Sequence, residues 1–188
     1  FEYQKKNAGK VQNIGQEISL YHKLLDLNQF EWDFTIIGSH FSNEVVDLNG
    51  EEFIHEFNGG EMMTREGESV SSFYGYQFNG VYASYEDAQE AGLVNDRGMA
   101  YGAGDAIYED ISGPDGEPDG IINAYDKQIL GSPTPEFFGS FSNTFSYNRL
   151  SLDIMLQFVY GNEMFNYVRY QNESMTDLAN QSTTVLKR

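Results

Sequence analysis

The chain has 188 residues, which is long enough for one domain with a sizeable core. Its net charge of -18 excludes nucleic acid as a partner, since phosphates are bound by Lys and Arg, and makes a bare anionic membrane surface an equally poor one. The lack of cysteine excludes a disulfide framework and a thiolate metal site. Aromatic residues make up 15% of the chain and glycine is frequent, a combination that favours β structure.

The first predicted element is a hairpin over residues 14–42. Its second half places apolar residues at every other position, a period of two that is typical of a strand; they are Phe30, Trp32, Phe34 and Ile36. Its first half alternates in the same way through Ile18, Leu20 and Leu24, although His22 interrupts the apolar row. Residues 27–29 are the predicted tight connection.

Residues 43–135 are predicted to form long acidic loops. A strand rich in aromatic residues is expected at 70–82, where packing against neighbours is a commoner role than stacking on sugar rings, and a short strand at 52–57. A short helix is predicted at 85–91, because Ser84 is a favourable N-cap, acids occupy the first turn and Gly92 can end it.

The clearest hairpin covers residues 136–162, and a loop with a helix is expected at 163–188. One strand carries Phe137, Phe141, Phe145 and Tyr147 on one face, with Phe138, Ser140, Ser142, Thr144 and Ser146 on the other. The partner strand carries six apolar residues in alternation: Leu150, Leu152, Ile154, Leu156, Phe158 and Tyr160.

This last row is long and has no charged residue on its apolar face, and it can be interpreted in two ways. About 11 positions without a charge on the apolar face match a tilted strand that crosses a bilayer, and ordinary globular strands are shorter. Lipid tolerates no charge on such a row, whereas polar residues on the alternate face suit a wet lumen. A soluble β-sandwich shows the same alternation, because one face of each sheet meets the core. The pattern alone leaves both open.

The segment from Gly104 to Leu130 contains an acidic loop with oxygen side chains at alternate positions. With Asp115 as position 1, Gly120 falls at position 6 and Asp126 at position 12, the spacing of an EF-hand-like calcium loop. The candidate Ca²⁺ ligands are Asp115, Glu117, Asp119, the carbonyl of Ile121, Asn123 and Asp126. Hydrated acidic turns without any ion have the same composition, so that alternative stays open.

Sequence signals for catalysis are absent. His22, His40 and His55 are scattered without metal-ligand spacing, and there is no nucleophile elbow, P-loop or dinucleotide fingerprint. Acid pairs are expected by chance in a chain with 29 acids. We therefore predict that the protein is not an enzyme.

Six pieces of the chain resemble the C-terminal half of the SusC/RagA-type TonB-dependent outer-membrane transporters, in the family's order. They cover most of the chain and are weakest at 43–63 and 86–100. The pieces are Asn7–Gly15, Arg65–Glu68 followed by Ser72–Tyr76, Gly104-Asp105 with Tyr108, Asp110 and Asp119-Gly120, Leu130–Pro133, Gly139–Tyr147, and Gln157–Asn162.

The resemblance implies an all-β fold, in which antiparallel up-and-down strands form part of a large transmembrane β-barrel with long acidic loops and a short loop helix. It implies import of oligosaccharides or peptides across the cell outer membrane of Bacteroidetes-like bacteria. The implied partners are a SusD-like surface lipoprotein, outer-membrane lipid, and the TonB complex, which would act through a plug not contained in these residues.

The predicted strands are too few for a complete barrel. Five or six strands cannot close a membrane barrel, which needs about eight, so further strands are required. Loops 43–69 and 84–131 are expected to meet the lipoprotein or the substrate. The alternative is a soluble, secreted β-domain that binds carbohydrate or calcium.

Overall fold

The computed structural model describes residues 9–176, 178 and 180–187. The chain divides into two compact units. Unit 1 comprises the residues up to Ile54 together with Met63–Ser72 and Gly131–Glu163; unit 2 comprises His55–Met62, Phe73–Leu130 and the residues from Met164 onward.

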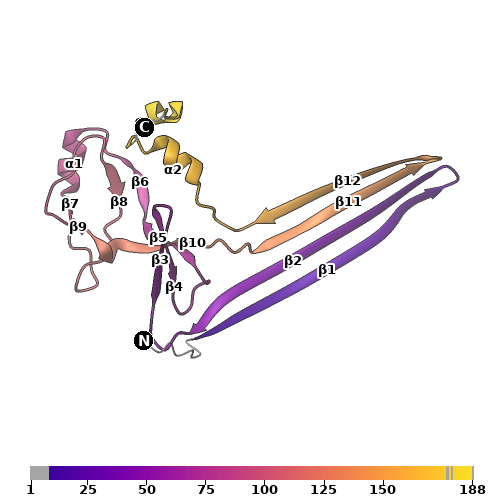
Figure 1. The fold of residues 1–188 in the computed structure, drawn as a ribbon, viewed down its shortest axis with the longest axis horizontal. Coiled ribbons are helices and arrows are strands. Elements are labelled where there is room, and N and C mark those ends of the chain that lie inside the picture. Colours follow the sequence, from indigo (N-terminus) through magenta and orange to yellow (C-terminus); the bar gives the residue numbers. More distant parts are fainter. Residues whose placement is uncertain (1–8, 177, 179, 188) are drawn as a thin grey trace. The chain divides into compact units, whose positions relative to one another are not determined.

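Unit 1 is built on a four-stranded antiparallel sheet in the order β1-β2-β11-β12 (Figure 1). The strands are β1 (Lys10–Leu27), β2 (Phe30–Asp47), β11 (Phe137–Tyr147) and β12 (Leu150–Tyr160). Both predicted hairpins are therefore present, and the first is longer than its predicted bounds of 14–42. Each has a two-residue connection, Asn28-Gln29 and Asn148-Arg149, and Asn148 adopts φ 54°, as primed hairpin turns require.

The register of the sheet corrects one detail of the predicted apolar row in β1. Lys23 lies opposite Asp33 and Leu25 opposite Trp32, with a shift between the two pairs. The extra residue is Leu24, so it forms a bulge and leaves the row. Leu25 and Leu27 continue the row instead, opposite Trp32 and Phe30.

Unit 2 contains shorter elements. A second four-stranded sheet has the order β10-β5-β4-β3. Its strands are β3 (Phe53–Phe57), β4 (Gly60–Thr64), β5 (Ser72–Tyr76) and β10 (Lys127–Gly131), whose ends continue into unit 1. The short pairs are β6 (Phe78–Val81) with β8 (Ala106–Tyr108), and β7 (Val94–Asn95) with β9 (Ile121–Ile122).

Two expectations for this region need correction. The strand predicted at 70–82 is two strands, β5 and β6, separated at Gln77. The strand expected near 52–57 exists as β3, but it has a hairpin partner, β4, that the sequence analysis missed. Asn58 (φ 42°) and Gly59 (φ 90°) form the turn between them.

The helix predicted at 85–91 is confirmed as α1 (Tyr85–Ala91). Ser84 accepts a hydrogen bond from the Asp87 amide, the Asp87 carboxylate accepts from the Ser84 amide, and Gly92 ends the helix at φ 68°. The remaining helical elements are η1 (Ala124–Asp126), α2 (Tyr167–Glu173) and η2 (Thr183–Lys187), and α2 supplies the helix expected in 163–188. None of the helices in the described part of the chain is long and apolar enough to cross a membrane.

Few hydrophobic residues within the described ranges are buried. Val45, Leu48 and Met63 are buried in unit 1, and Tyr82, Ala88 and Ile122 in unit 2. By contrast, every residue of β1 and β12 is exposed. A sandwich would cover one face of these strands with a second sheet, and the described residues supply no such cover over β1 and β12.

Candidate functional site

The long sheet of unit 1 has an apolar face. Directly opposed residues of antiparallel strands point to the same side, so the register assigns each side chain to a face. Phe141 lies opposite both Ile36 and Leu156, and Phe145 lies opposite both Trp32 and Leu152. The apolar face comprises Ile18, Leu20, Leu25, Leu27, Phe30, Trp32, Phe34, Ile36, Phe137, Phe141, Phe145, Tyr147 and the row Leu150, Leu152, Ile154, Leu156, Phe158 and Tyr160.

Aromatic contacts and one polar pair organise the apolar face. Phe34 meets Phe141 edge to face at 5.2 Å, and the ring of Trp32 stacks on Phe145 at 5.4 Å. Trp32 Nε1 donates to Asn143 Oδ1 at 3.0 Å. The pair gives both polar groups a partner, so Asn143 costs little on the apolar face. His22 lies at the same level of the face, opposite Phe34.

The opposite side of the same sheet is the polar face. Its polar residues are Glu17, Ser19, Tyr21, Lys23, Glu31, Asp33, Thr35, Ser140, Ser142, Thr144, Ser146, Ser151, Asp153 and Gln157. The same face also carries the apolar residues Ile37, Phe138, Met155 and Val159. Tyr21 donates to Asp33 at 2.5 Å, and Thr144 donates to Asp153 at 2.7 Å. Lys23 lies 3.0 Å from Glu31. Where β2 pairs with β11, the charged groups therefore gather on this side.

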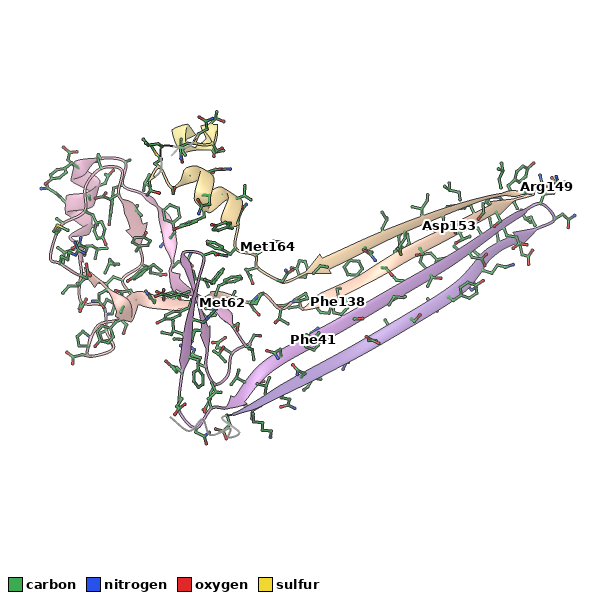
Figure 2. All side chains as sticks on the ribbon, in the orientation of Figure 1. Phe41, Met62, Phe138, Arg149, Asp153 and Met164 are labelled. Carbon is green, nitrogen blue, oxygen red and sulfur yellow. The ribbon has the colours of Figure 1, made fainter. Side chains whose placement is uncertain are left out.

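Both faces are uncovered, as the side chains standing on the long strands show (Figure 2). Leu150 is 75% exposed, Leu156 57% and Phe158 49%. Soluble monomers rarely expose so large a contiguous apolar surface. A sheet with one apolar and one polar face, neither buried, can separate a hydrocarbon phase from an aqueous one.

The end of β2 away from the tight turns is held by the segment Arg65–Glu68, one of the pieces that resembled the transporter family. The Val45 amide donates to the Glu68 carbonyl, and the Gly67 amide donates to the Val45 carbonyl, each at 2.9 Å. The Glu66 carboxylate accepts from the Leu48 amide at 2.7 Å and from the Gly50 amide at 3.3 Å. No pattern in the sequence indicated this role of Glu66.

In the acidic loop, the structure brings Asp119 together with Asp110 and places Asp115 elsewhere. Asp110 Oδ2 accepts from the Gly120 amide at 2.7 Å, and Asp110 Oδ1 from the Asp119 amide at 3.3 Å. Asp119 Oδ1 accepts from the Ile121 amide at 2.9 Å. Asp115 and Glu117 are exposed, within the turn that follows Gly113.

Asp126 is the fully buried anchor of the same loop. Its Oδ1 accepts from the amides of Ile111 (2.9 Å) and Ser112 (3.2 Å), and its Oδ2 from the Asn123 amide (2.8 Å). Asn123 in turn accepts from the Tyr125 amide at 2.9 Å. Both oxygens of the predicted position-12 ligand are thus engaged by backbone, which is a structural role.

These positions bear on the six predicted calcium ligands. Asp119, Ile121, Asn123 and Asp126 lie in one hydrogen-bonded loop, whereas Asp115 and Glu117 lie in the exposed turn before it. No group of three or more His, Asp or Glu side chains among the residues that the structure describes is placed to hold a metal ion. Calcium binding stays a prediction.

A charged and aromatic cluster in unit 2 was not anticipated. Lys127 Nζ lies 2.7 Å and 2.8 Å from the two oxygens of Glu61, and 5.5 Å from the ring centre of Tyr76. Burial lowers the pKa of Lys127, but the hydrogen bond and charge of Glu61 outweigh it, so the pKa lies above its usual value. Burial also raises the pKa of Tyr76. Glu61 and Lys127 are 66 positions apart, so sequence alone does not pair them.

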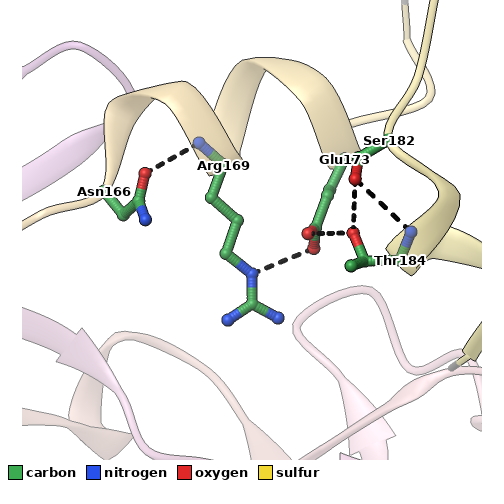
Figure 3. Close-up of polar contacts among 5 residues, drawn as sticks. All are labelled: Asn166, Arg169, Glu173, Ser182 and Thr184. Atoms are coloured by element: carbon green, nitrogen blue, oxygen red, sulfur yellow. Dashed lines mark hydrogen bonds and ion pairs between the residues drawn. The ribbon is translucent and has the colours of Figure 1, made fainter.

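The C-terminal helix α2 carries a compact polar cluster (Figure 3). Asn166 caps the helix by accepting from the Arg169 amide at 2.9 Å, and Arg169 Nε lies 3.0 Å from Glu173 Oε2. The buried Glu173 carboxylate also accepts from the Thr184 hydroxyl at 2.5 Å. These contacts tie the segment after α2 to the helix.

Curated relatives of the chain are TonB-dependent receptors. The chain is 34% identical over 171 residues to TonB-dependent receptor P26 of Formosa agariphila, covering 88% of this chain and 16% of the relative. It is 29% identical over 169 residues to TonB-dependent receptor P3 of the same organism, covering 86% of this chain and 16% of the relative. The chain thus spans about one sixth of the length of these relatives. No protein-family model matches it.

Among solved structures, the chain is similar to the RagAB peptide transporter, with a TM-score of 0.72 and 21% sequence identity. The match covers 99% of this chain and 19% of the transporter chain. That match confirms the predicted fold class. Relatives that are receptors also confirm the prediction that the chain is not an enzyme. Sequence and fold together confirm the resemblance seen in the six motifs: the chain corresponds to a segment of TonB-dependent receptors of the SusC/RagA type.

Proposed function

We propose that the chain forms part of the wall and the outer loops of an outer-membrane importer. The observation that carries this proposal is the sheet β1-β2-β11-β12, whose apolar and polar faces are both exposed. In such a wall the apolar face lies in lipid and the polar face lines the lumen.

Strand length supports the same assignment. An 11-residue strand at about 3.4 Å per residue is about 37 Å long, and at a tilt of about 45° it rises about 26 Å. The apolar band of outer-membrane barrels is about 25 Å tall. The strands β11 and β12 each have 11 residues, and the short turns at Asn28-Gln29 and Asn148-Arg149 suit the periplasmic side.

The test uses the full-length protein. We expect it to be extracted only with detergent, to insert into lipid vesicles, and to expose the tight turns to protease on one side of the bilayer and loop 84–131 on the other. Recovery as a monodisperse monomer without detergent would contradict a role in the outer membrane.

The finer parts of the proposal concern partners, energy and cargo. We propose that a SusD-like lipoprotein covers the outer loops, that the TonB complex supplies energy through parts of the protein not contained in this chain, and that the cargo is an oligosaccharide or a peptide. The similarity of the fold to RagAB, which is a peptide transporter, supports the peptide alternative. Co-purification of a lipoprotein, and uptake of labelled glycans or peptides that is lost when TonB is deleted, test these points separately.

Calcium binding by the acidic loop is a separate proposal. It is supported by the alternating oxygen side chains of Asp115, Glu117, Asp119 and Asn123. Calorimetric titration of the protein with calcium should give binding heat that Asp119→Ala reduces. Equal heats in both proteins would remove the proposal and leave Asp126 as a purely structural anchor.

A further inference from the structure

The apolar face of the long sheet is interrupted by a groove where glycines face each other. Gly38 of β2 lies directly opposite Gly139 of β11. In the neighbouring strand β1, Ile18 lies opposite Gly38, and in the neighbouring strand β12, Phe158 lies opposite Gly139. Two adjacent strands therefore lack side chains at one level of the sheet, and Ile18 and Phe158 stand at either side of the gap.

The groove is an open depression on the surface of the sheet, with a volume of about 410 Å³. Its lining includes Ile18, Gly38, Phe137 and Phe158. The ring of Phe158 leans over Gly139, since a Cβ on that glycine would come within 3.0 Å of it. At the level of the two glycines, the floor is thus backbone, and Ile18 and Phe158 beside it contribute hydrocarbon.

The polar residues that line the groove are Gln16, Glu17, Ser39 and His40, and all four lie at its end away from the tight turns. Gln16 and His40 belong to the level next to the glycines, on the side away from the tight turns, and both line the groove. His40 Nδ1 lies 2.8 Å from the Glu136 carbonyl, and its ring packs on Phe137 at 4.7 Å. An apolar site with polar groups at one end has the polarity of a lipid, with a hydrocarbon tail and a polar headgroup.

We propose that this groove binds one acyl chain of a membrane lipid in the leaflet away from the tight turns, with the headgroup beside Gln16 and His40. The inference rests on the proposed function, which places the apolar face in the bilayer. Water is a poor occupant, because an apolar groove gives it few of the partners it needs. An empty groove forfeits the dispersion contacts of its whole lining. A flexible acyl chain fills it at the lowest cost.

The chain offers a clean variant for testing the groove. Gly38 does not have a positive φ, and a Cβ there would meet only Ile18 Cγ2, at the ordinary distance of 3.6 Å. Gly38→Val therefore fills the groove without backbone strain. Gly139 is unsuitable, because a Cβ there would collide with the Ile37 carbonyl oxygen.

Gly15 provides the matched control. It lies opposite Phe41, on the polar side of the sheet and outside the groove lining, and a Cβ there would have its nearest neighbour at 3.7 Å. Gly15→Val thus makes the same chemical change in the same sheet, but leaves the groove open.

The experiment reconstitutes the full-length protein in phosphatidylglycerol bilayers with a trace of phosphatidylglycerol that is nitroxide-labelled on the acyl chain. Electron paramagnetic resonance then gives the number of motionally restricted lipids per protein. We expect the wild-type protein and Gly15→Val to restrict the same number, and Gly38→Val to restrict one fewer, with faster exchange of the remainder.

Three outcomes overturn the inference or its basis, and they are distinguishable. Equal restricted populations in all three proteins would show that the groove holds no lipid. A change of oligomeric state in Gly38→Val would show that a protein neighbour occupies it. Absence of any restricted lipid in the wild-type protein would instead refute the proposed function, because the apolar face would not lie in the bilayer.

Discussion

The long sheet of unit 1 and the loops of unit 2 are stabilised in opposite ways. The sheet has extensive backbone pairing and almost no buried side chain, so its apolar face is left uncovered by the residues that the structure describes. Unit 2 has short elements, but its polar groups are satisfied locally, as at Asp126 and around Lys127. The sheet therefore depends on its surroundings for stability, whereas the loops depend on single anchoring residues.

The largest effect is expected from a charge placed in the middle of the apolar face. Leu156→Arg should destabilise the folded full-length protein in lipid by about 2–4 kcal/mol, because an arginine near the bilayer midplane loses its hydration. The neighbouring change Gln157→Arg places the same charge on the polar face and should cost little. Urea unfolding in vesicles measures both, and equal losses would mean that both faces are wet.

Asp126→Ala should produce the next largest effect, and only in the loops. It removes the acceptor of three backbone amides. Asp126 itself is fully buried, but the donors belong to the half-buried residues Ile111, Ser112 and Asn123, which water can reach in part, so the total loss should be about 1–3 kcal/mol. We expect faster hydrogen exchange at Ile111, Ser112 and Asn123 with no change in β11 or β12.

Asp115→Ala is the control for this experiment, since Asp115 is exposed in the same loop. Its effect should stay within about 0.5 kcal/mol, as for an ordinary surface change. Similar exchange in both variants would show that Asp126 is not the anchor.

The contrast between the two units also explains what the sequence could predict. The apolar row of β12 and the two faces of β11 can be predicted from alternation alone, because successive side chains of a strand point to opposite faces of the sheet. The bulge at Leu24 breaks that rule, since an inserted residue leaves no signal in composition and shifts every later residue of β1 to the other face. The row was therefore read correctly at Ile18 and Leu20 and wrongly at Leu24.

In the loops, predictions succeeded where the signal was local. The capping box of α1 involves residues three positions apart, so Ser84 and Gly92 were sufficient. The partnership of Glu61 with Lys127 and the hold of Glu66 on the end of β2 join distant segments. A single sequence contains no pattern that indicates which residues of distant segments contact each other. The acidic loop is an intermediate case. Its acidic composition can be recognised from the local sequence, but which aspartates lie close together depends on the turn after Gly113.

Removal of the α1 cap should have a smaller and strictly local effect. Ser84→Ala should cost about 1 kcal/mol, because it removes the acceptor for the Asp87 amide. Ser84→Thr keeps a hydroxyl at this position and should retain most of the stability. Protease cleavage within residues 85–91 of the full-length protein is the measurement; unchanged cleavage in Ser84→Ala would mean that packing of Ala88 alone holds the helix.

The smallest expected effect is the alkaline loosening of the cluster around Lys127. Burial lowers the Lys127 pKa, but the Glu61 contact more than compensates, and burial raises the Tyr76 pKa. A group whose pKa is raised on folding binds its proton more tightly in the folded state, so its contribution is complete below the unfolded-state pKa and is lost as pH rises through the folded-state value. Near-ultraviolet circular dichroism of the tyrosines should therefore change between about pH 10 and 12. Lys127→Arg, which keeps its charge in that range, should move the change to higher pH. An identical alkaline transition in Lys127→Arg and the wild-type protein would show that tyrosine ionisation alone, and not the Glu61 contact, limits the stability of this cluster.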